Sequence, residues 1–575
     1  MIVFNVKFRN ILSTTGAAAS LALGGCSGAS PGNLTADVNQ DWCLSGGEIY
    51  TAIDSTPRAE AVAVKDGIIT YAGKNDGDWC ANHTRPTARR YDLGGAAVYP
   101  GLTDAHGHLL GIGLREMTLN LEGSASIKEL KSRLKEEIDQ TPAGQTVYGR
   151  GWIETHWPEK RFPNREDLDA VSPHHPVILE RSDGHAVVVN SAAIAASGIT
   201  RNTTPPFGGD ILKDSQGEPT GMLIDKAGDL VMGLVDSLTP ERREAAYIKG
   251  AALYASRGWT QIHSMSVDPA DTALLERLAS QGKIGIRVYN SIDVLDNMDM
   301  SELAKGSSAD SPLIETRAIK LYSDGALGSR GAALIEPYDD DPKNEGLVML
   351  TRQRVMPLLK TALVNGIQVN THAIGDRANR LVLSWYEDAM SAIPENERKV
   401  KDPRWRIEHS QIIAVDDIPR FATAGIIPSM QPSHAIGDLH FAVDRIGKDR
   451  LKGGYAWRSL IDSGSIIAGG SDAPVEVGDP RIEFYAATVR KDANGYSNDA
   501  WYPDEKVTPQ EALKMFTAWA AYAAFQEDTL GTIEAGKRAD FTVLSRDIMT
   551  AAPADILTAQ TLMTIVDGVA VFEAP

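Results

Sequence analysis

Residues 97–109, A-V-Y-P-G-L-T-D-A-H-G-H-L, place two histidines two positions apart at the end of an apolar run. Such a run predicts a short buried strand. Side chains two apart on a strand point to the same side, so His106 and His108 can both reach one metal ion. One such pair alone is weak support for a metal site, so further metal-capable residues are needed elsewhere in the chain.

Three further metal-capable residues occur in the same kind of setting. His372 ends the run I-Q-V-N-T-H, His409 ends R-W-R-I-E-H, and Asp472 follows S-I-I-A-G-G-S. Each run predicts a strand, and strand ends are where a (β/α)8 barrel carries its chemistry. Lys320 lies within another apolar run, A-I-K-L-Y. Because a buried ammonium without a partner is costly, Lys320 needs a partner in the site.

The ordered set H-x-H, Lys, His, His and Asp, each near the end of a strand, resembles the amidohydrolase superfamily. The flanking sequences are similar to its YtcJ-like branch, which includes N-substituted formamide deformylases. The matching stretches begin at Gly101, Gly151, Arg181, Lys320, His372, Ile407 and Gly469. This resemblance covers most of the chain after residue 40. It implies an α/β fold, a (β/α)8 TIM barrel with a small β-sandwich domain built from both chain termini.

The resemblance implies six metal ligands: His106, His108, Lys320, His372, His409 and Asp472. The first two histidines and the aspartate would hold a more buried ion, and the other two histidines a second one. Lys320, carboxylated on Nζ by CO2, would bridge the two. Neutral imidazole and carboxylate suit Zn²⁺ and similar divalent ions, and the absence of cysteine ligands disfavours a closed structural zinc site. One ion or two, and the carboxylation itself, stay open because some amidohydrolases use one metal.

Metal-assisted hydrolysis is the activity that the resemblance implies. Metal ions sharing a water lower its pKa towards neutrality and provide hydroxide as nucleophile. Asp472 is the expected catalytic base, which takes the proton and returns it to the departing nitrogen. We therefore expect a metal-dependent hydrolase acting on a non-peptide C–N bond, an N-acyl or N-formyl amide of a small molecule.

Two other functions stay open. A cyclic amidase or an esterase of the same superfamily would use the same ligands. A non-catalytic regulatory or binding lipoprotein would stand on an inactivated barrel. Because all six ligand positions are filled, the sequence favours catalysis.

Four more side chains are candidates for substrate contact: His185, His263, Arg330 and His434. The histidines lie near predicted strand ends or in an insertion, and they could equally tie loops together. Arg330 could pair with a substrate carboxylate or with a loop acid. Glu408 precedes His409 on its strand and points the other way, so we expect it to position or pack.

Length and charge limit the organisation of the chain. At 575 residues it exceeds one compact core. Lys plus Arg total 57 against 76 for Asp plus Glu, a net charge of −19, which argues against nucleic acid as a partner. Strand-like runs at both ends predict one discontinuous β domain, residues 41–98 plus 526–575, around a barrel over 99–525.

An insertion in the barrel is expected at about 145–235. Only omission of P-V-I-L-E-R-S-D-G-H from the barrel strands puts the lysine on strand four, as in the family. The Pro- and Gly-rich section 204–221 has too few apolar residues for a helix or a buried strand. We expect it to be a loop that covers the substrate.

The first 25 residues predict a lipoprotein signal peptide. Lys7 and Arg9 precede an apolar stretch, and Leu23-Gly24-Gly25-Cys26 resembles a bacterial lipobox. Cys26 would carry the lipid, residues 26–40 would form a tether, and Ser27 favours the outer membrane. A plain secretory signal with a chance cysteine is the alternative. Either one implies export to the periplasm.

Export changes the meaning of Cys43 and Cys80. An oxidising periplasm permits this remaining pair to form a disulfide, and two free buried thiols are the alternative. After the N-terminus no apolar run is long enough to span a bilayer, so the membrane would be reached only through the lipid anchor. The sequence leaves the oligomeric state open, a homo-oligomer included.

Overall fold

The computed structural model describes residues 41–575 except 155–156, 183, 185, 207–208, 236–237, 295–299, 304–311 and 494–498. The predicted signal peptide, the tether, Cys26 and His185 therefore lie outside the described residues. Three β-sheets organise the described chain, with helices packed around them. Within those residues, no helix is both long and apolar enough to cross a membrane.

The central sheet has eight parallel strands, whose order in the sheet is their order along the chain. They are β6 (Leu102–Gly107), β13 (Trp259–Val267), β14 (Arg287–Asp293), β15 (Ile314–Tyr322), β16 (Gln368–Ala373), β17 (Arg406–His409), β18 (Ile427–Met430) and β19 (Ala468–Gly469). Two backbone hydrogen bonds join the last strand's end to the first. The N–H of Asp472 donates to the His106 carbonyl at 2.6 Å, and that of His108 to the Ala473 carbonyl at 2.8 Å. The predicted (β/α)8 barrel is confirmed.

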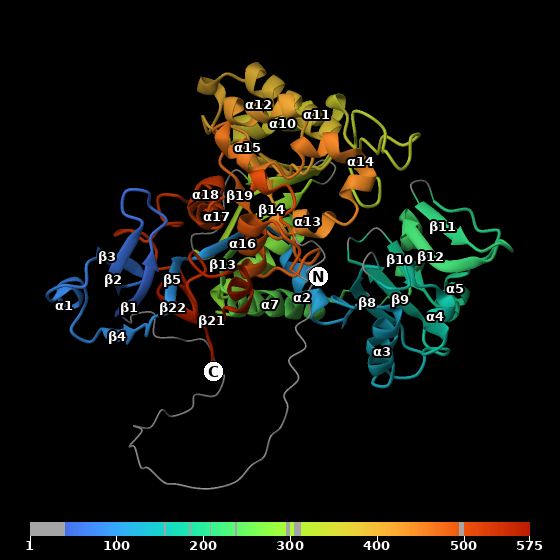
Figure 1. Ribbon diagram of the computed structural model, residues 1–575, viewed down its shortest axis with the longest axis horizontal. Helices are drawn as coiled ribbons and strands as arrows, with labels where there is room; N and C mark the ends of the chain where they lie inside the picture. Colours follow the sequence, from blue (N-terminus) through green and yellow to red (C-terminus); the bar gives the residue numbers. More distant parts are fainter. Residues whose placement is uncertain are drawn as a thin grey trace, which may run out of the picture.

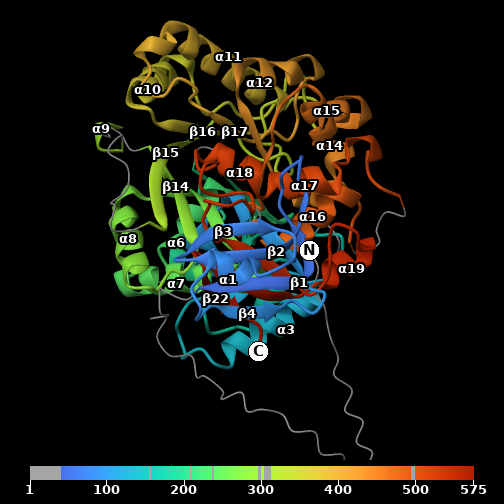
Figure 2. The same cartoon turned by 90° about the vertical axis from the view of Figure 1, so that its left-hand side faces the viewer.

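Helices cover the outside of the barrel (Figures 1 and 2). The main ones are α7 (Pro240–Arg257), α8 (Thr272–Ser280), α10 (Arg352–Asn365), α11 (Asp376–Ala392), α12 (Ile418–Ala424), α15 (Trp457–Asp462), α16 (Pro480–Val489), α17 (Pro509–Met515) and α18 (Ala518–Ala523). The longest, α7, begins after Thr239, whose hydroxyl accepts the backbone N–H of Arg242. It ends at Gly258, where φ is 103° and a side chain would be strained. Strands covered on both faces are rich in apolar residues, which is why the barrel strands could be found in the sequence.

Both chain ends contribute to one small domain. Its strands are β1 (Trp42–Tyr50), β2 (Arg58–Lys65), β3 (Ile68–Gly73), β4 (Arg89–Asp92), β5 (Ala97–Pro100), β20 (Phe541–Leu544), β21 (Thr561–Val566) and β22 (Val569–Glu573). They belong to a single hydrogen-bonded sheet, in which β5 and β20 pair antiparallel with Val98 opposite Val543. A disulfide joins Cys43 on β1 to Cys80 in α1 (Trp79–His83).

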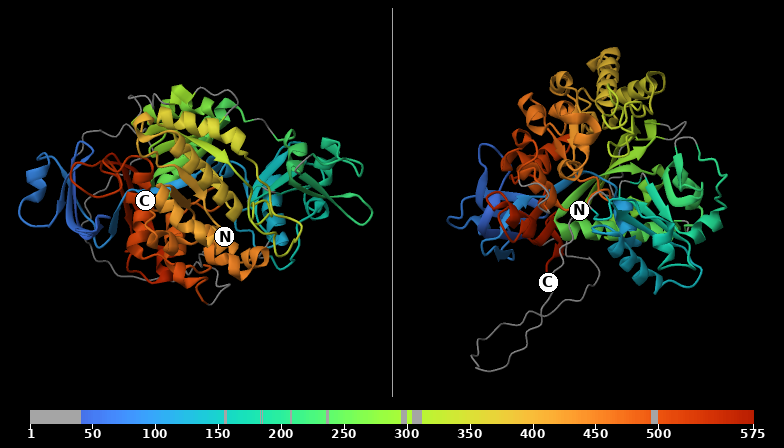
Figure 3. Two further views of the ribbon diagram at one scale, coloured as in Figure 1. Left: turned by 90° about the horizontal axis from the view of Figure 1, so that it is seen from above. Right: turned by 45° about the vertical axis from the view of Figure 1, so that its right-hand side comes forward.

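A third sheet lies between the first and second barrel strands in the sequence. It consists of β7 (Leu119–Asn120), β8 (Val147–Trp152), β9 (Val177–Arg181), β10 (Ala186–Val189), β11 (Gly209–Lys213) and β12 (Pro219–Asp225). Helices α3 (Ile127–Ile138), α4 (Arg165–Asp169) and α5 (Ser191–Ser197) pack on it. In Figures 1 and 3 this subdomain and the small domain lie on opposite sides of the barrel.

Two details of the predicted insertion are corrected. The sheet starts at β7, well before residue 145, because a strand of two residues gives no periodic signal. The section 204–221 was expected to be a loop over the substrate, but it supplies β11 and the start of β12. β11 is the edge strand of the sheet and β12 its neighbour, and one apolar residue of each, Ile211 and Leu223, is buried in the same hydrophobic cluster.

Candidate metal centre

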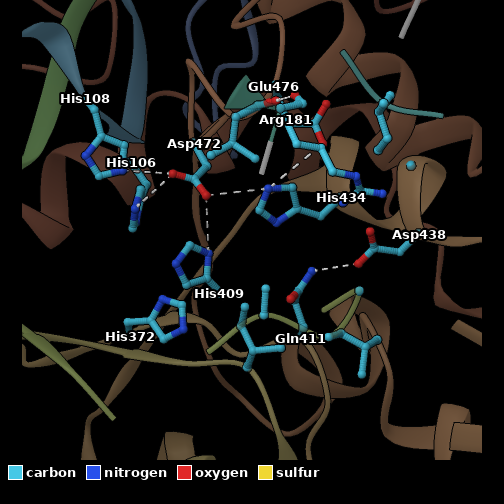
Figure 4. A pocket seen from close by; sticks show the side chains of 18 of the residues that line it. His106, His108, Arg181, His372, His409, Gln411, His434, Asp438, Asp472 and Glu476 are labelled. Atoms are coloured by element: carbon cyan, nitrogen blue, oxygen red, sulfur yellow. Dashed lines mark hydrogen bonds and ion pairs between the residues drawn. The ribbon is translucent and has the colours of Figure 1, made fainter. Parts of the chain in front are cut away.

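The carboxyl ends of barrel strands bring three predicted ligands together (Figure 4). His106 lies at the end of β6, His409 ends β17, and Asp472 follows β19. One ligand atom from each lies within 4.8 Å of the other two, and all three residues are buried. Among the described residues, this is the one group of three or more His, Cys, Asp or Glu side chains with such spacing.

The other three predicted ligands lie around this group. Nε2 of His108 is 3.0 Å from Oδ1 of Asp472, and Nζ of Lys320 is 3.4 Å from Nε2 of His106. The rings of His372 and His409 lie 4.6 Å apart. All six line one cavity of about 310 Å³.

The outer nitrogens of three of these histidines are already engaged. Nδ1 of His106 donates to Oε2 of Glu408 at 2.6 Å, Nδ1 of His108 to the Met265 carbonyl at 3.1 Å, and Nδ1 of His409 to Oε1 of Gln431 at 2.9 Å. Each partner is an oxygen acceptor, so Nδ1 carries the proton and the lone pair is on Nε2. Nε2 of His372 is buried, has no hydrogen-bond partner in the described part of the chain, and lies 3.4 Å from Oδ1 of Asp324. Three imidazoles thus offer Nε2 to a metal ion, and the ring of His372 lies next to that of His409.

Burial sets the charges of the site. It lowers the pKa of His106 to about 3, with Lys320 adding to the effect, and it lowers that of His409 well below the usual value. Both rings are therefore neutral, the form that binds metal. Burial also lowers the pKa of Lys320. The pKa of Asp472 is held well below its usual range: burial acts in the opposite direction, but the surrounding histidines outweigh it.

Two buried acids, Glu408 and Asp104, fix the positions of the ligands through hydrogen bonds. Glu408 is fully buried and pairs with Nε of Arg406 at 2.8 Å, so Arg406 and His106 outweigh burial and hold its pKa well below the usual range. Asp104 accepts the backbone N–H and the hydroxyl of Ser471 at 2.9 and 2.5 Å and the Tyr254 hydroxyl at 2.8 Å. These bonds fix the seam between β19 and β6, and with it the placement of Asp472 beside His106.

The comparison with known proteins agrees with this geometry. A family profile described as "Amidohydrolase family" matches residues 89–572. The chain belongs to the amidohydrolase family. It is 34% identical to the putative amidohydrolase YtcJ of Bacillus subtilis, over 92% of this chain and 98% of that one. It is 29% identical to the N-substituted formamide deformylase of Arthrobacter pascens, over 93% of this chain and 98% of the relative.

A solved structure has the same architecture. The crystal structure of an uncharacterized metal-dependent hydrolase from Pyrococcus horikoshii superposes with a TM-score of 0.71 at 26% identity, covering 89% of this chain and 99% of that one. Family and fold together support a hydrolase and confirm the resemblance on which the prediction of a barrel was based.

The substrate candidates of this amidohydrolase have different outcomes. His434 of α13 (Pro432–Asp438) lines the cavity, with Nε2 3.6 Å from Oδ2 of Asp472. His263 does not line it: the residue is fully buried lower in the barrel and accepts a hydrogen bond from Nη1 of Arg406 at 2.9 Å. Arg330 does not line it either, because its Nε and Nη2 donate to Asp340 at 3.0 and 2.8 Å. The predicted substrate contacts of His263 and Arg330 are thus corrected. His185 lies outside the described residues.

Several lining residues of the amidohydrolase cavity were not predicted. The insertion contributes Ile153, Arg181 and Ser182, and the segment after Asp472 contributes Glu476. Other walls come from Leu327, Gln411, Asp438 and Phe441. Arg181 lies in the matching stretch R-S-D-G-H-A, the one signal that pointed towards it.

Proposed function

We propose that the protein is a metal-dependent hydrolase of small molecules that cleaves a non-peptide C–N bond, in an N-acyl or N-formyl amide. The convergence of neutral imidazole nitrogens and one carboxylate in one cavity carries this proposal. Similarity to an enzyme named for removing formyl groups from substituted formamides supports the amide class.

The ligand set fits zinc, since imidazole and carboxylate suit this ion and one cavity face stays open to substrate. A bound divalent ion would polarise the amide carbonyl and activate water. Asp472 is ionised and lines the cavity, so it takes the proton of the attacking water and returns it to the departing nitrogen. Glu408 holds the proton of His106 on Nδ1 and keeps Nε2 directed into the cavity.

Metal analysis combined with a substrate screen tests this function. The purified protein should contain a divalent metal and should hydrolyse members of a panel of N-formyl, N-acyl and cyclic amides and esters. Removal of the metal by a chelator should abolish the activity, and zinc should restore it. Turnover of cyclic amides or esters alone would favour those superfamily activities. A metal-free protein that is inert across the panel would favour a binding or regulatory role.

A second ion is part of the proposal. His372 and His409 would hold it, and Lys320 carboxylated by CO2 would bridge the two ions. Only a neutral amine reacts with CO2, and burial favours that form of Lys320. Carboxylation would also place an anion between the two metal ions, which reduces their mutual repulsion.

We also propose that the protein is exported and anchored to the outer membrane through a lipid on Cys26. The Cys43–Cys80 disulfide supports export, because such bonds persist in oxidising compartments. In a Gram-negative host the wild-type chain should fractionate with outer membranes and the Cys26→Ala chain should not. Equal solubility of the two chains would refute the anchor.

A further inference from the structure

Beyond the metal ligands, the cavity wall carries the acid Glu476. Its Oε1 lies 4.0 Å from Nε2 of His434, which is itself 3.6 Å from Oδ2 of Asp472 (Figure 4). A single imidazole therefore separates Glu476 from the reacting end of the cavity. The segment is held in place, since the Glu476 carbonyl accepts from Nη1 of Arg115 at 3.0 Å and the Val475 carbonyl accepts from Ser182 at 2.9 Å.

His434 is built into this wall without a hydrogen bond. The residue is 7% exposed, yet neither ring nitrogen has a hydrogen-bond partner in the part of the chain that the structure describes. Buried polar atoms almost always have partners, so a group entering from the cavity is expected to supply one. Ser433, next to it, donates its backbone N–H to Oε2 of the fully buried Glu483 at 3.0 Å, which fixes the start of α13.

Charge around Glu476 favours a positive or N–H-bearing ligand group. Burial raises the pKa of Glu476 to about 7, with His434 acting in the opposite direction. Arg181, the cation that the insertion contributes to the cavity, donates from Nε and Nη2 to Glu154 at 2.9 and 3.2 Å, so its charge is compensated there. Leu327 and Phe441 make other walls apolar. An acid in such surroundings gains strongly from a cation.

We propose that Glu476 and His434 form the recognition site for an ammonium or other N–H-bearing group of the substrate. The substrates would then be amides that carry an amino group on a short apolar linker, for example N-formyl or N-acyl derivatives of diamines. The carboxylate of Glu476 accepts charge-assisted hydrogen bonds from the amino group, and the apolar walls contact the linker. This inference rests on the proposed amide hydrolase function.

Three N-formyl amides of equal length, ending in an ammonium, a methyl or a carboxylate group, test the inference. The ammonium amide should have a kcat/KM at least about tenfold above that of the methyl amide, the size expected of one charge-assisted hydrogen bond. Glu476→Gln should remove this preference by raising KM for the ammonium amide, while the methyl amide changes less than about threefold. Equal rates for both amides in the wild type, or a preference for the carboxylate, would overturn it.

Calorimetric binding of butylammonium to the metal-loaded protein separates this inference from the proposed function. The ion should bind the wild type and the surface control Glu395→Gln alike, and Glu476→Gln about tenfold more weakly. Glu476→Asp keeps the charge and should keep binding. Thermal unfolding checks that each variant is folded. Binding without hydrolysis of any amide would refute the proposed function and leave the cation site standing. Absence of binding, or equal binding by Glu476→Gln, would overturn the cation site.

Discussion

Arg287 and Lys320 are buried basic side chains on neighbouring barrel strands, but at opposite ends of the barrel. Arg287 begins β14 and donates from Nε and Nη2 to Asp540 at 2.7 and 3.1 Å and to Asp567 at 2.6 Å. Both acids belong to the small domain, and they outweigh burial and raise the pKa of Arg287. Lys320 lies near the carboxyl end of β15 beside His106, and burial lowers its pKa.

The two ends of the barrel thus differ in how their polar groups are satisfied. At the amino end, charges pair within the chain and join the small domain to the barrel. At the carboxyl end, His372 and His434 keep ring nitrogens without hydrogen-bond partners among the described residues. Since a buried polar atom without a partner is destabilising, the carboxyl end is built for groups that the chain does not supply. The predictions below test this division between stability and function.

The largest effect is expected from Asp472→Asn. Asn is nearly isosteric and still offers an oxygen to a metal, but it cannot accept a proton at neutral pH. The variant should keep much of its metal and lose about 10² to 10⁴ in kcat, with the acidic limb of the pH profile altered. Metal content and kcat on an amide whose chemistry is rate-limiting are the measurements. An unchanged kcat would show that another group carries the proton.

Arg287→Met should have the next largest effect, on stability alone. It leaves Asp540 buried without its cation, and removal of one partner from a buried ion pair costs about 3 to 5 kcal/mol. Urea unfolding followed by tryptophan fluorescence measures the loss, with metal content and kcat of the folded variant unchanged. Arg352→Met is the matched control, because Arg352 and Asp388 are 64% and 50% exposed and their pair contributes about 1 kcal/mol or less. A fall in kcat with Arg287→Met would contradict the division between a stabilising amino end and a functional carboxyl end.

Lys320→Ala should affect metal binding and activity, whereas Arg287→Met affects stability. Without the bridging group the two ions would repel each other, so metal affinity should fall by about 10- to 100-fold and activity should fall with it. Short carboxylic acids should restore part of the activity by filling the gap. Metal titration and kcat are the readouts. Full metal occupancy with normal turnover would exclude the bridge and favour a single ion.

The sequence predicted the barrel and the ligand cluster for the same physical reason. Strands buried on both faces are rich in apolar residues, and a metal-capable residue at the end of such a run is conspicuous. Parallel strands then bring those ends together, so His106, His372 and His409 could be placed from sequence alone. The boundary of the insertion could not, because β7 is two residues long and depends on pairing with β8.

The substrate side of the cavity was much less accessible from sequence. Glu476 and Arg181 are separated by 295 positions in the sequence. They line the same cavity only because the insertion lies over the barrel. His263 shows the opposite difficulty. The alternation of side chains along β13 correctly predicts that His263 points into the barrel. It does not predict how far along the barrel axis the residue lies, and His263 is four residues before the strand ends. It therefore belongs to an interior layer of the barrel below the cavity.

The smallest effect is expected from Glu511→Gln, where a partly exposed acid is paired. Glu511 lies at the third position of α17, accepts from Nη1 and Nη2 of Arg458 at 2.7 and 2.8 Å, and accepts the backbone N–H of Thr508 at 2.8 Å in a capping box. The Arg458 hydrogen bonds lower the pKa of Glu511 from its ordinary value of 4.5 to about 2. A group whose pKa falls on folding stabilises the folded state above its ordinary pKa and loses that contribution as the pH falls towards the folded value.

Glu511→Gln should therefore lower the unfolding free energy by about 1 kcal/mol at pH 7, the size of a helix cap and a partly exposed pair. The difference from the wild type should shrink as the pH falls from 4.5 towards 2, because the wild-type carboxylate becomes protonated and loses its charge. Urea unfolding across this range measures it, with kcat at pH 7 unchanged. A difference that stayed constant with pH would assign the effect to the hydrogen bonds that the amide cannot reproduce rather than to the charge. The Glu511–Arg458 pair would then differ from the buried pairs of Arg287 at the amino end, whose contribution to stability is electrostatic.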